Sequence, residues 1–467
     1  MTAGAAGRTA AQRLARFVAG LSLEVIPRPV VDQAALLALD TLGNALAAAG
    51  EDFGRAALDV AERLGGAPES ALLGRSTRVA AANAVLANAT LAHGLDFDDT
   101  REDAIVHTGC VAVTTALAVG ETVVASGRTM LEAVIAGVEV MCRVGLAVPG
   151  ALHARHFHPT AIAGGFGAVA AAGRLQRLNE AQLTHAFGIV GSQASGIIEY
   201  LADGSWTKRM HPGWAAHAGV VATLLARGGF SGPASVLEGE HGLYAAFAGG
   251  HDAARLDALL GTLGTTWELA ELTLKPYPCG SIAQPYMDCA ARLREHGIAA
   301  DAISAIRCRT SAGPVPRLWE PLAAKHAPPN GYAAKFSLPY LIALILVKGR
   351  AGLAEFTDAA VRDRDVLRLA SRVTYELDPS IDYPRQFVGD VEVTLTDGRR
   401  LRERQDRPRG GPDAPLTRAE IEAKFRGNAG LALPGGRADG VIAGVNALPT
   451  ASNLKDLITA LTPESHR

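Results

Sequence analysis

Apolar and polar positions follow one period in the first part of this chain and another after about residue 267. In the first part, apolar residues recur every three or four positions, which is typical of helices that bury one face. Helices are expected over about 9–20, 30–48, 54–64, 78–94, 110–125, 129–147, 160–174 and 179–191, and from Trp214 onward. No convincing strand separates them, and consecutive helices without strands predict an all-α domain.

Beyond Trp267, three segments alternate apolar and polar residues one by one, which is the period of half-buried strands. These segments are ISAIRCRTSA, SRVTYELD and DVEVTLTDGRRLRER, and Asp397-Gly398 predicts a hairpin turn in the last of them. Further helices are expected at about 283–296, 335–348, 355–370 and 416–426, and before the C-terminus. We therefore predict a mainly α protein, with a helical domain from residues 1–268 and 408–467 and a smaller α+β domain at 269–407.

Composition narrows the class of protein. A chain of 467 residues is too long for one ordinary core, so two or more domains are expected. The net charge of −2 gives no basic field for nucleic acid. No apolar run reaches the ~18 residues of a membrane span, and the N-terminus lacks a clean signal-peptide core, so we expect a cytoplasmic protein. The five cysteines form no CxxC pair, which argues against a zinc site or a disulfide framework.

The stretch DGSWTKRMHPGWAAHAG has the strongest chemical character. Lys208 and Arg209 place two cations between Trp206 and Trp214, on a predicted loop just before a helix start. Backbone N–H groups at such a start also favour an anion, so the stretch predicts an anion pocket. The alternative is a solvated Lys-Arg pair on a surface loop, with the tryptophans as ordinary packing.

The stretch LDFDDT carries three carboxylates, from Asp96, Asp98 and Asp99. Carboxylates this close either bind a metal or repel one another until one is protonated or paired. The simpler interpretation is an acidic turn that caps a helix.

Histidines follow in two places. His107 lies shortly after LDFDDT, and RHFHPT holds His156 and His158 at alternate positions, so their side chains should point apart and make poor joint metal ligands. A single histidine beside a helix start is a plausible acid or base, although a satisfied core histidine is the commoner outcome. Lys275, in LKPYP, either faces a ligand or lies in a hinge between domains. Together these residues suggest cations that hold substrate carboxylates and a histidine that moves a proton beside them.

Five ordered motifs, LAHGLDFDDT, FHPTA, DGSWTKRMHPGWAAHAG, LKPYPCGS and AAKFSLPY, make nearly the whole chain resemble the MmgE/PrpD family. That family contains 2-methylcitrate dehydratases, cis-aconitate decarboxylases and an iminodisuccinate epimerase. The resemblance implies a helical domain built from both chain ends, an α+β lid, a homodimer, and catalysis without a metal or an organic cofactor. The family's active-site positions correspond to Asp96, Thr100, His107, His158, Lys208 and Lys275. In the decarboxylases a lid histidine follows five residues after the position of Lys275, where this chain has Gly280, so the dehydratase branch is the better match.

The expected function is a cofactor-independent lyase, a dehydratase of a small di- or tricarboxylic acid resembling 2-methylcitrate. His107 and His158 are the expected acid and base, in either order, and Asp96 is expected to orient a histidine or a lysine. The residues expected to bind substrate, beside the catalytic Lys208, are Thr100, Lys275, Arg209 and Trp206.

Three alternatives remain open from the sequence. Epimerisation or decarboxylation would be another fate of the same alpha-carbanion. An isoprenoid synthase could use DDTRE as a magnesium motif, but no second acidic motif is present and aromatic residues make up only 5% of the chain. A non-enzymatic helical binding protein would leave His107, His158 and Lys208 apart in space.

Overall fold

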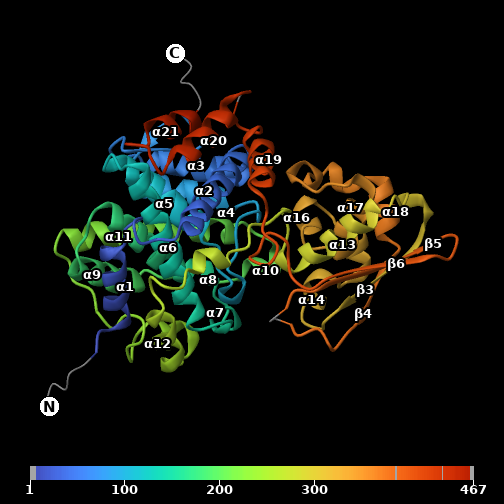
Figure 1. The fold of residues 1–467 in the computed structure, drawn as a ribbon, viewed down its shortest axis with the longest axis horizontal. Helices are drawn as coiled ribbons and strands as arrows, with labels where there is room; N and C mark the ends of the chain where they lie inside the picture. Colours follow the sequence, from blue (N-terminus) through green and yellow to red (C-terminus); the bar gives the residue numbers. More distant parts are fainter. Residues whose placement is uncertain (1–6, 384–385, 434, 463–467) are drawn as a thin grey trace. The chain divides into compact units, whose positions relative to one another are not determined.

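The computed structural model describes residues 7–383, 386–433 and 435–462 and is mainly helical with some strands, as the pattern predicts (Figure 1). The chain divides into two compact units. Unit 1 runs to Leu272 and resumes at Thr417, and unit 2 extends from Thr273 to Leu416. The boundaries expected from the sequence lie a few residues before these positions.

Unit 1 is built from helices with one small sheet. The helices are α1 (Ala10–Gly20), α2 (Arg28–Ala48), α3 (Asp52–Leu64), α4 (Ala81–His93), α5 (Gly109–Thr122), α6 (Gly127–Leu146), α7 (Ala151–Ala154), α8 (Pro159–Leu175), α9 (Glu180–Gly191), α10 (Tyr200–Asp203), α11 (Thr207–Arg227), α12 (Ala253–Gly261), α19 (Arg418–Ala429), α20 (Arg437–Ala447) and α21 (Lys455–Leu461). Strands β1 (Ser70–Ala71) and β2 (Arg78–Val79), which the sequence pattern did not reveal, pair antiparallel. Strands this short lack room for an alternating pattern.

Helices α5, α6 and α8 form the centre of unit 1 and are buried on almost every side. Small residues let them approach closely. A Cβ added at Gly137 of α6 would lie 2.9 Å from the Ala112 side chain and 3.1 Å from the carbonyl oxygen of Gly167 on α8. Helices that are apolar on all faces belong in a core, and this core fixes the helix ends that carry the chemistry.

Helix α11 begins at Thr207, so the expectation that a loop continues to Trp214 is wrong. Pro212 lies inside the helix, although it has no N–H to donate to the preceding turn. Tertiary packing accounts for this. A Cβ at Gly213 would lie 2.2 Å from the carbonyl oxygen of Leu86, which shows how closely α11 packs on α4. Lys208 and Arg209 therefore lie in the first turn of a helix.

Helices from the N-terminal and C-terminal parts of the sequence pack together within unit 1, where α19 lies along α2 (Figure 1). Phe425 of α19 lies against Gly43 of α2, where a Cβ would be only 2.9 Å from its ring. Helix α20 also contacts α2, and α21 packs on α20. Among the described residues, no helix combines the length and apolar character needed to cross a membrane.

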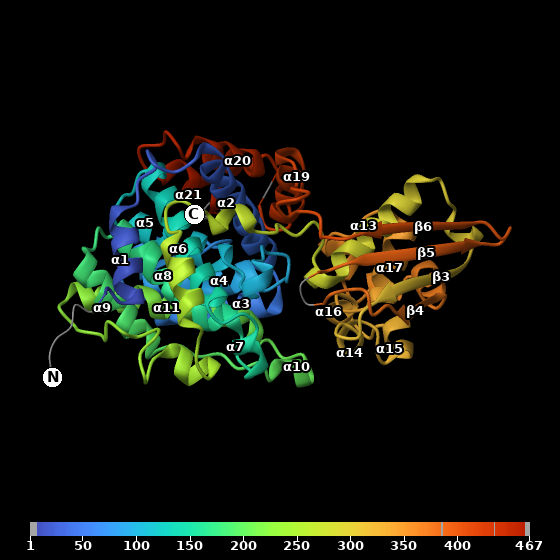
Figure 2. The same ribbon diagram turned by 60° about the horizontal axis from the view of Figure 1, so that its bottom comes forward.

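Unit 2 is an α+β unit with a four-stranded sheet in the order β4-β3-β5-β6 (Figure 2). The strands are β3 (Ile303–Thr310), β4 (Val373–Leu377), β5 (Gly389–Leu395) and β6 (Arg400–Gln405). Strands β5 and β6 form the predicted antiparallel hairpin, and Gly398 takes a φ of +88° at its turn. Helices α13 (Gln284–Glu295) and α17 (Leu338–Lys348) pack on the sheet, and α18 (Arg364–Ala370) contacts α17.

Candidate active site

The loop after α4 carries the three carboxylates of LDFDDT, and each has a different main partner. Asp96 accepts a hydrogen bond of 2.8 Å from Lys208 Nζ. Asp98 Oδ2 lies 2.7 Å from His93 Nδ1. Asp99 bonds the start of α5. The three carboxylates therefore do not act as one metal-binding group.

Asp99 holds the loop against the N-terminus of α5. Its carboxylate accepts bonds from the backbone N–H groups of Thr108 (2.9 Å) and Gly109 (2.8 Å) and from the Thr108 hydroxyl (2.7 Å). Burial, followed by the nearby charge of Asp98, raises the pKa of Asp99 to about 7, against the effect of these hydrogen bonds. This carboxylate is the helix cap that the sequence offered as the simpler interpretation of LDFDDT.

Asp96 has a left-handed backbone, with φ of +60°. Aspartate tolerates this conformation better than most residues do. The ion pair that it forms with Lys208 is largely buried, with 15% of the lysine side chain and 7% of the aspartate side chain exposed. Asp96 thus contacts a lysine, and its role of orienting that lysine in catalysis stays a prediction.

His93 is the last residue of α4, and the sequence analysis did not single it out. Its Nδ1 donates to Asp98, an arrangement that fixes the tautomer and leaves Nε2 as the nitrogen with a lone pair. Nε2 is buried and has no hydrogen-bond partner among the described residues. A buried polar atom without a partner is costly, so a proton, a water molecule or a ligand at this nitrogen would be stabilising.

His107 is held by the same loop. Its Nδ1 lies 2.7 Å from the carbonyl oxygen of Asp99, 3.4 Å from Thr100 Oγ1 and 3.5 Å from Asp98 Oδ1. Because a carbonyl oxygen can only accept, the 2.7 Å contact with Asp99 means that His107 Nδ1 carries a proton and donates it. The lone pair of the neutral ring is then on Nε2. Its backbone N–H donates to Thr160 Oγ1 on α8, so α8 also fixes its position.

His158 occupies the N-cap position of α8, and its Nδ1 lies 3.1 Å from Nδ1 of His211 on α11. Burial lowers the pKa of His158 well below its ordinary value, with smaller effects from neighbouring imidazoles and Lys208. Burial and the same kind of neighbours lower the pKa of His211 to about 4. Both rings are therefore neutral near pH 7. His156, by contrast, is exposed, as the alternation in RHFHPT predicts.

These histidines form one cluster of four buried rings, which we call the imidazole cluster: His93, His107, His158 and His211. The ring centres lie 4.7 Å apart for His93–His107, 5.5 Å for His93–His158, 6.4 Å for His107–His158 and 5.2 Å for His158–His211. Lys208 and His211 are three residues apart on α11. Residues at this spacing share a face of a helix, so Lys208 lies on the same side as the cluster. The structure thus brings together Asp96, Thr100, His107, His158 and Lys208.

Arg209 and Trp206 lie in a different environment. The Arg209 guanidinium is 4.3 Å above the Phe53 ring, and the Trp206 ring packs edge-on against the same phenylalanine at 6.3 Å. A stacked guanidinium of this kind serves packing. The part that either residue would take in substrate binding remains a proposal.

Lys275 lies in unit 2, after the short helix Glu268–Glu271 that ends unit 1. Its side chain is buried, which does not fit a lysine that simply faces water. Its role as a substrate-binding residue therefore rests on the family resemblance.

A second buried network binds the carboxylate loop at the backbone carbonyl of Phe97. Lys424 of α19 lies 2.6 Å from Asp40 Oδ1 and donates to the carbonyl oxygen of Phe97 at 2.7 Å. Asn44 Nδ2 bonds both Asp40 Oδ2 and the same carbonyl at 3.2 Å, and Asn428 donates to Asn44 at 3.0 Å. We call this group the Phe97 clamp. It fixes the residue between Asp96 and Asp98, and no motif in the sequence pointed to it.

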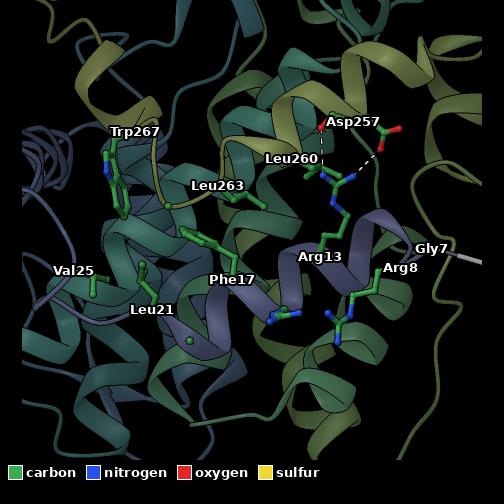
Figure 3. Close-up of a pocket in the computed structure, with 13 residues that line it drawn as sticks. Gly7, Arg8, Arg13, Phe17, Leu21, Val25, Asp257, Leu260, Leu263 and Trp267 are labelled. Atoms are coloured by element: carbon green, nitrogen blue, oxygen red, sulfur yellow. Dashed lines mark hydrogen bonds and ion pairs between the residues drawn. The ribbon is translucent and has the colours of Figure 1, made fainter.

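Two pockets of unit 1 are large enough to admit a small ligand among those formed by the described residues. One, of about 680 Å³, is lined by His211, Tyr200, Met210 and Trp214 among others, so it adjoins the imidazole cluster. The other, of about 720 Å³, lies between α1 and α12, where Arg13 bonds Asp257 beside Phe17 (Figure 3). It contains none of the candidate catalytic groups.

His93 and His211 are the site residues that the sequence analysis missed, whereas Asp98 was named there only as one of three neighbouring carboxylates. His93 could have been found from the sequence, because it is the polar residue at the end of an alanine-rich helix that is expected to be buried. His211 follows Lys208 by three residues, which would have placed both on one face had α11 been predicted to start at Thr207.

Comparison with known proteins decides the family. The model of the MmgE/PrpD N-terminal domain matches residues 12–256, and that of the MmgE/PrpD C-terminal domain matches residues 277–447. The chain belongs to the MmgE/PrpD family. The resemblance inferred from the five motifs is thereby confirmed, and of the clustered positions Asp96, Thr100, His158 and Lys208 belong to those motifs.

Curated relatives are similar along almost the full chain. The cis-aconitate decarboxylase of Homo sapiens is 26% identical over 462 residues, covering 96% of this chain and 94% of that protein. The cis-aconitate decarboxylase-like protein oryM of Aspergillus oryzae is 24% identical, covering 97% of each chain. The cis-aconitate decarboxylase of Aspergillus terreus is 23% identical, covering 95% of each.

Proposed function

We propose that this protein is an enzyme, a lyase that acts on a small di- or tricarboxylic acid without a metal ion or an organic cofactor. The observation that carries this proposal is the imidazole cluster, buried beside a lysine that is paired with a carboxylate. Such a site supplies neutral bases and a fixed positive charge, and membership of the MmgE/PrpD family supports the same class of chemistry.

The first step is removal of the proton alpha to a substrate carboxylate. His158 enters the reaction unprotonated, because burial and its cationic and imidazole neighbours lower its pKa, so it is suited to accept the proton. His107 holds its Nδ1 proton on a carbonyl and presents Nε2 as the partner acid or base. His93 is a third candidate, oriented by Asp98.

Lys208 is the proposed anchor for the carboxylate on which negative charge builds. In the structure its ammonium donates a hydrogen bond to Asp96, which holds the ammonium in place. A fixed cation stabilises the developing charge because it needs no reorganisation during the reaction. Thr100, Lys275, Arg209 and Trp206 complete the proposed substrate-binding set.

Dehydration is the proposed outcome. The base takes the alpha proton, a carbon–carbon double bond forms, and the carbon–oxygen bond at the adjacent carbon breaks. The leaving hydroxide takes a proton from an imidazolium and departs as water. The substrate would resemble 2-methylcitrate, and Gly280 at the position of the decarboxylase lid histidine favours this branch.

Decarboxylation is the second candidate, because the relatives described above are named as cis-aconitate decarboxylases. In that reaction a carbon–carboxylate bond breaks, its electron pair stays on carbon, and an imidazolium protonates the carbon. The same histidines and Lys208 would serve both reactions.

A product assay separates the candidates. The purified chain, treated with a chelator, is incubated with 2-methylcitrate, citrate and cis-aconitate, and products are followed by proton NMR. We expect loss of water from a hydroxylated substrate. Release of carbon dioxide from cis-aconitate would assign the second reaction, and inversion of an aspartate-derived acid, added as a fourth substrate, would assign epimerisation. No turnover of any of these acids would refute the lyase proposal.

A homodimer is part of the proposal. Several large apolar side chains around the 680 Å³ pocket are exposed: Ile197, Leu201, Trp206, Met210 and Trp214. Exposed apolar side chains that line one pocket, as Ile197, Met210 and Trp214 do, are typical of interaction sites, and a second copy of the chain is the partner that the family resemblance implies. Light scattering on Trp214→Glu and Met210→Glu variants would detect loss of the dimer.

A further inference from the structure

Three rings of the imidazole cluster share one arrangement. His93 and His107 hold Nδ1 against an oxygen atom of unit 1, which leaves Nε2 for a ligand, and His158 does the same in the tautomer whose Nδ1 donates to His211 Nδ1. One ring nitrogen of each lies within 4.8 Å of one from each of the others, and all three residues are buried. These are the features of a site with three histidine ligands.

The spacing fits a small divalent ion. With zinc–nitrogen bonds of about 2.0–2.1 Å and tetrahedral angles, the ring centres of three histidine ligands lie roughly 5 Å apart. Two of the three centre-to-centre distances, 4.7 Å and 5.5 Å, are close to this value. The third, 6.4 Å between His107 and His158, needs one ring to swing inward by about 1 Å to reach the same spacing.

The groups behind the rings also match a metal site. Metal-binding histidines usually donate their other ring N–H to a carboxylate, a carbonyl or a similar acceptor. Here Asp98 takes that role for His93 and the Asp99 carbonyl for His107, while His211 contacts His158. His93 Nε2, buried and without a hydrogen-bond partner among the described residues, is a second and independent sign of a ligand-binding atom.

Charge and access are compatible with a cation. Asp96 and Asp98 contribute two carboxylates beside the cluster against the single ammonium of Lys208, so the surroundings are not a barrier to a divalent ion. The pocket lined by His211 provides an approach from the surface to the ring that contacts His158.

We infer that His93, His107 and His158 form a binding site for a single Zn²⁺ ion and that the ion inhibits the enzyme. Inhibition follows because zinc would occupy the same Nε2 atoms that move protons in the proposed reaction. This second clause rests on the proposed function, whereas the binding clause stands on geometry alone. The ion is an inhibitor here and no part of the catalytic cycle.

The binding clause is tested with Co²⁺ and Zn²⁺ on the full chain after chelator treatment. We expect one ion per chain by calorimetry, and intense visible absorption from tetrahedral Co²⁺. His93→Asn and His158→Asn should each weaken Zn²⁺ binding by more than about 100-fold, and Asp98→Asn by about 10–100-fold because it only orients a ligand. His217→Asn is the matched control, since His217 stacks on Trp214 outside the cluster.

The outcomes separate binding from function. Reversible loss of activity on adding Zn²⁺, with the affinity measured by calorimetry, supports both clauses. Cobalt binding by a chain that turns over none of the tested acids would keep the site and refute the lyase proposal. Circular dichroism establishes that each variant is folded. Octahedral cobalt spectra, or zinc binding equally tight in wild type and both folded histidine variants, would overturn the inference.

Discussion

Lys208 and Arg209 are adjacent in sequence but have different surroundings, so they form an internal comparison. Lys208 pairs with Asp96 beside the imidazole cluster, whereas the Arg209 guanidinium stacks on Phe53. We expect Lys208→Ala to lower kcat/KM by about 100-fold or more, because one lost charge-stabilising contact costs roughly 3–4 kcal/mol in the transition state. Steady-state kinetics on folded protein measures this.

Two further variants sharpen the comparison. Lys208→Arg should not restore full activity, because a planar guanidinium does not replace a compact ammonium in a fitted site. Arg209→Ala should lower kcat/KM by less than Lys208→Ala does, because its guanidinium stacks on Phe53. An inactive Arg209→Ala beside a Lys208→Ala variant close to wild type would show that the anion-binding role belongs to the neighbouring residue.

His107 and His158 are the proposed acid and base, and each is replaced by glutamine, which keeps most of the volume and hydrogen bonding. We expect turnover to fall by about 100-fold or more in each variant, since a positioned proton-transfer group contributes about that factor. His185→Gln, at a site where the ring contacts the Gly232 carbonyl, is the control and should be unchanged. Full activity in both cluster variants would remove these histidines from the mechanism.

His211 predicts a pH dependence of stability. Burial, with smaller electrostatic effects of the neighbouring His93 and Lys208, lowers its folded pKa from 6.5 to about 4. Between these values the unfolded chain binds a proton that the folded chain does not, so the contribution of His211 to the free energy of unfolding falls as the pH falls from about 6.5 to about 4. Asp99, with its pKa raised to about 7, acts in the opposite direction.

Because Asp99 and His211 have opposite effects, the measurement compares the pH dependence of the free energy of unfolding between wild type and a variant without His211. Urea unfolding of wild type and His211→Gln is compared at several pH values between 4 and 7. Wild type should lose more stability than the variant on acidification. Parallel pH profiles for the two proteins would contradict the assignment of a neutral, buried His211.

At the scale of elements, the Phe97 clamp joins α19 to the loop that carries Asp96 and Asp98. Burial raises the pKa of Asp40, and Lys424 opposes that effect, so the pair is a buried ion pair whose partners depend on each other. Lys424→Met leaves Asp40 without its cation and should cost about 3–5 kcal/mol of the free energy of unfolding. It should also lower kcat/KM, because the Phe97 carbonyl loses a donor.

Asp40→Asn combined with Lys424→Met should recover part of the lost stability, because no buried charge then remains unpaired. The control on the same helix is Arg426→Ala, which removes a half-exposed ion pair with Asp439 and should change stability by less than about 1 kcal/mol. Chemical denaturation followed by circular dichroism measures all three. A Lys424→Met variant as stable as wild type would remove the clamp as a structural link.

At the scale of the whole chain, unit 1 needs both ends of the sequence. A chain that stops at Leu416 would lack Lys424, Phe425 and Asn428, and would expose the apolar face of α2 on which α19 packs. We expect this truncated chain to lose cooperative thermal unfolding of unit 1 and to have no activity. Recovery of both properties on adding residues 417–467 as a separate peptide would show that the segment acts by packing. An unchanged thermal midpoint in the truncated chain would contradict the prediction.

The sequence by itself determined the helical class, the hairpin of unit 2 and the chemical character of LDFDDT, FHPT and WTKRMH, because periodicity and residue type are local properties. It placed the start of α11 too late, since close packing on α4 overrides the local signal of Pro212. Only the tertiary structure placed His93 and His211 in the cluster and Lys424 behind Phe97. Those contacts join segments far apart in the sequence, and no local pattern records which distant helix will supply the partner of a buried charge.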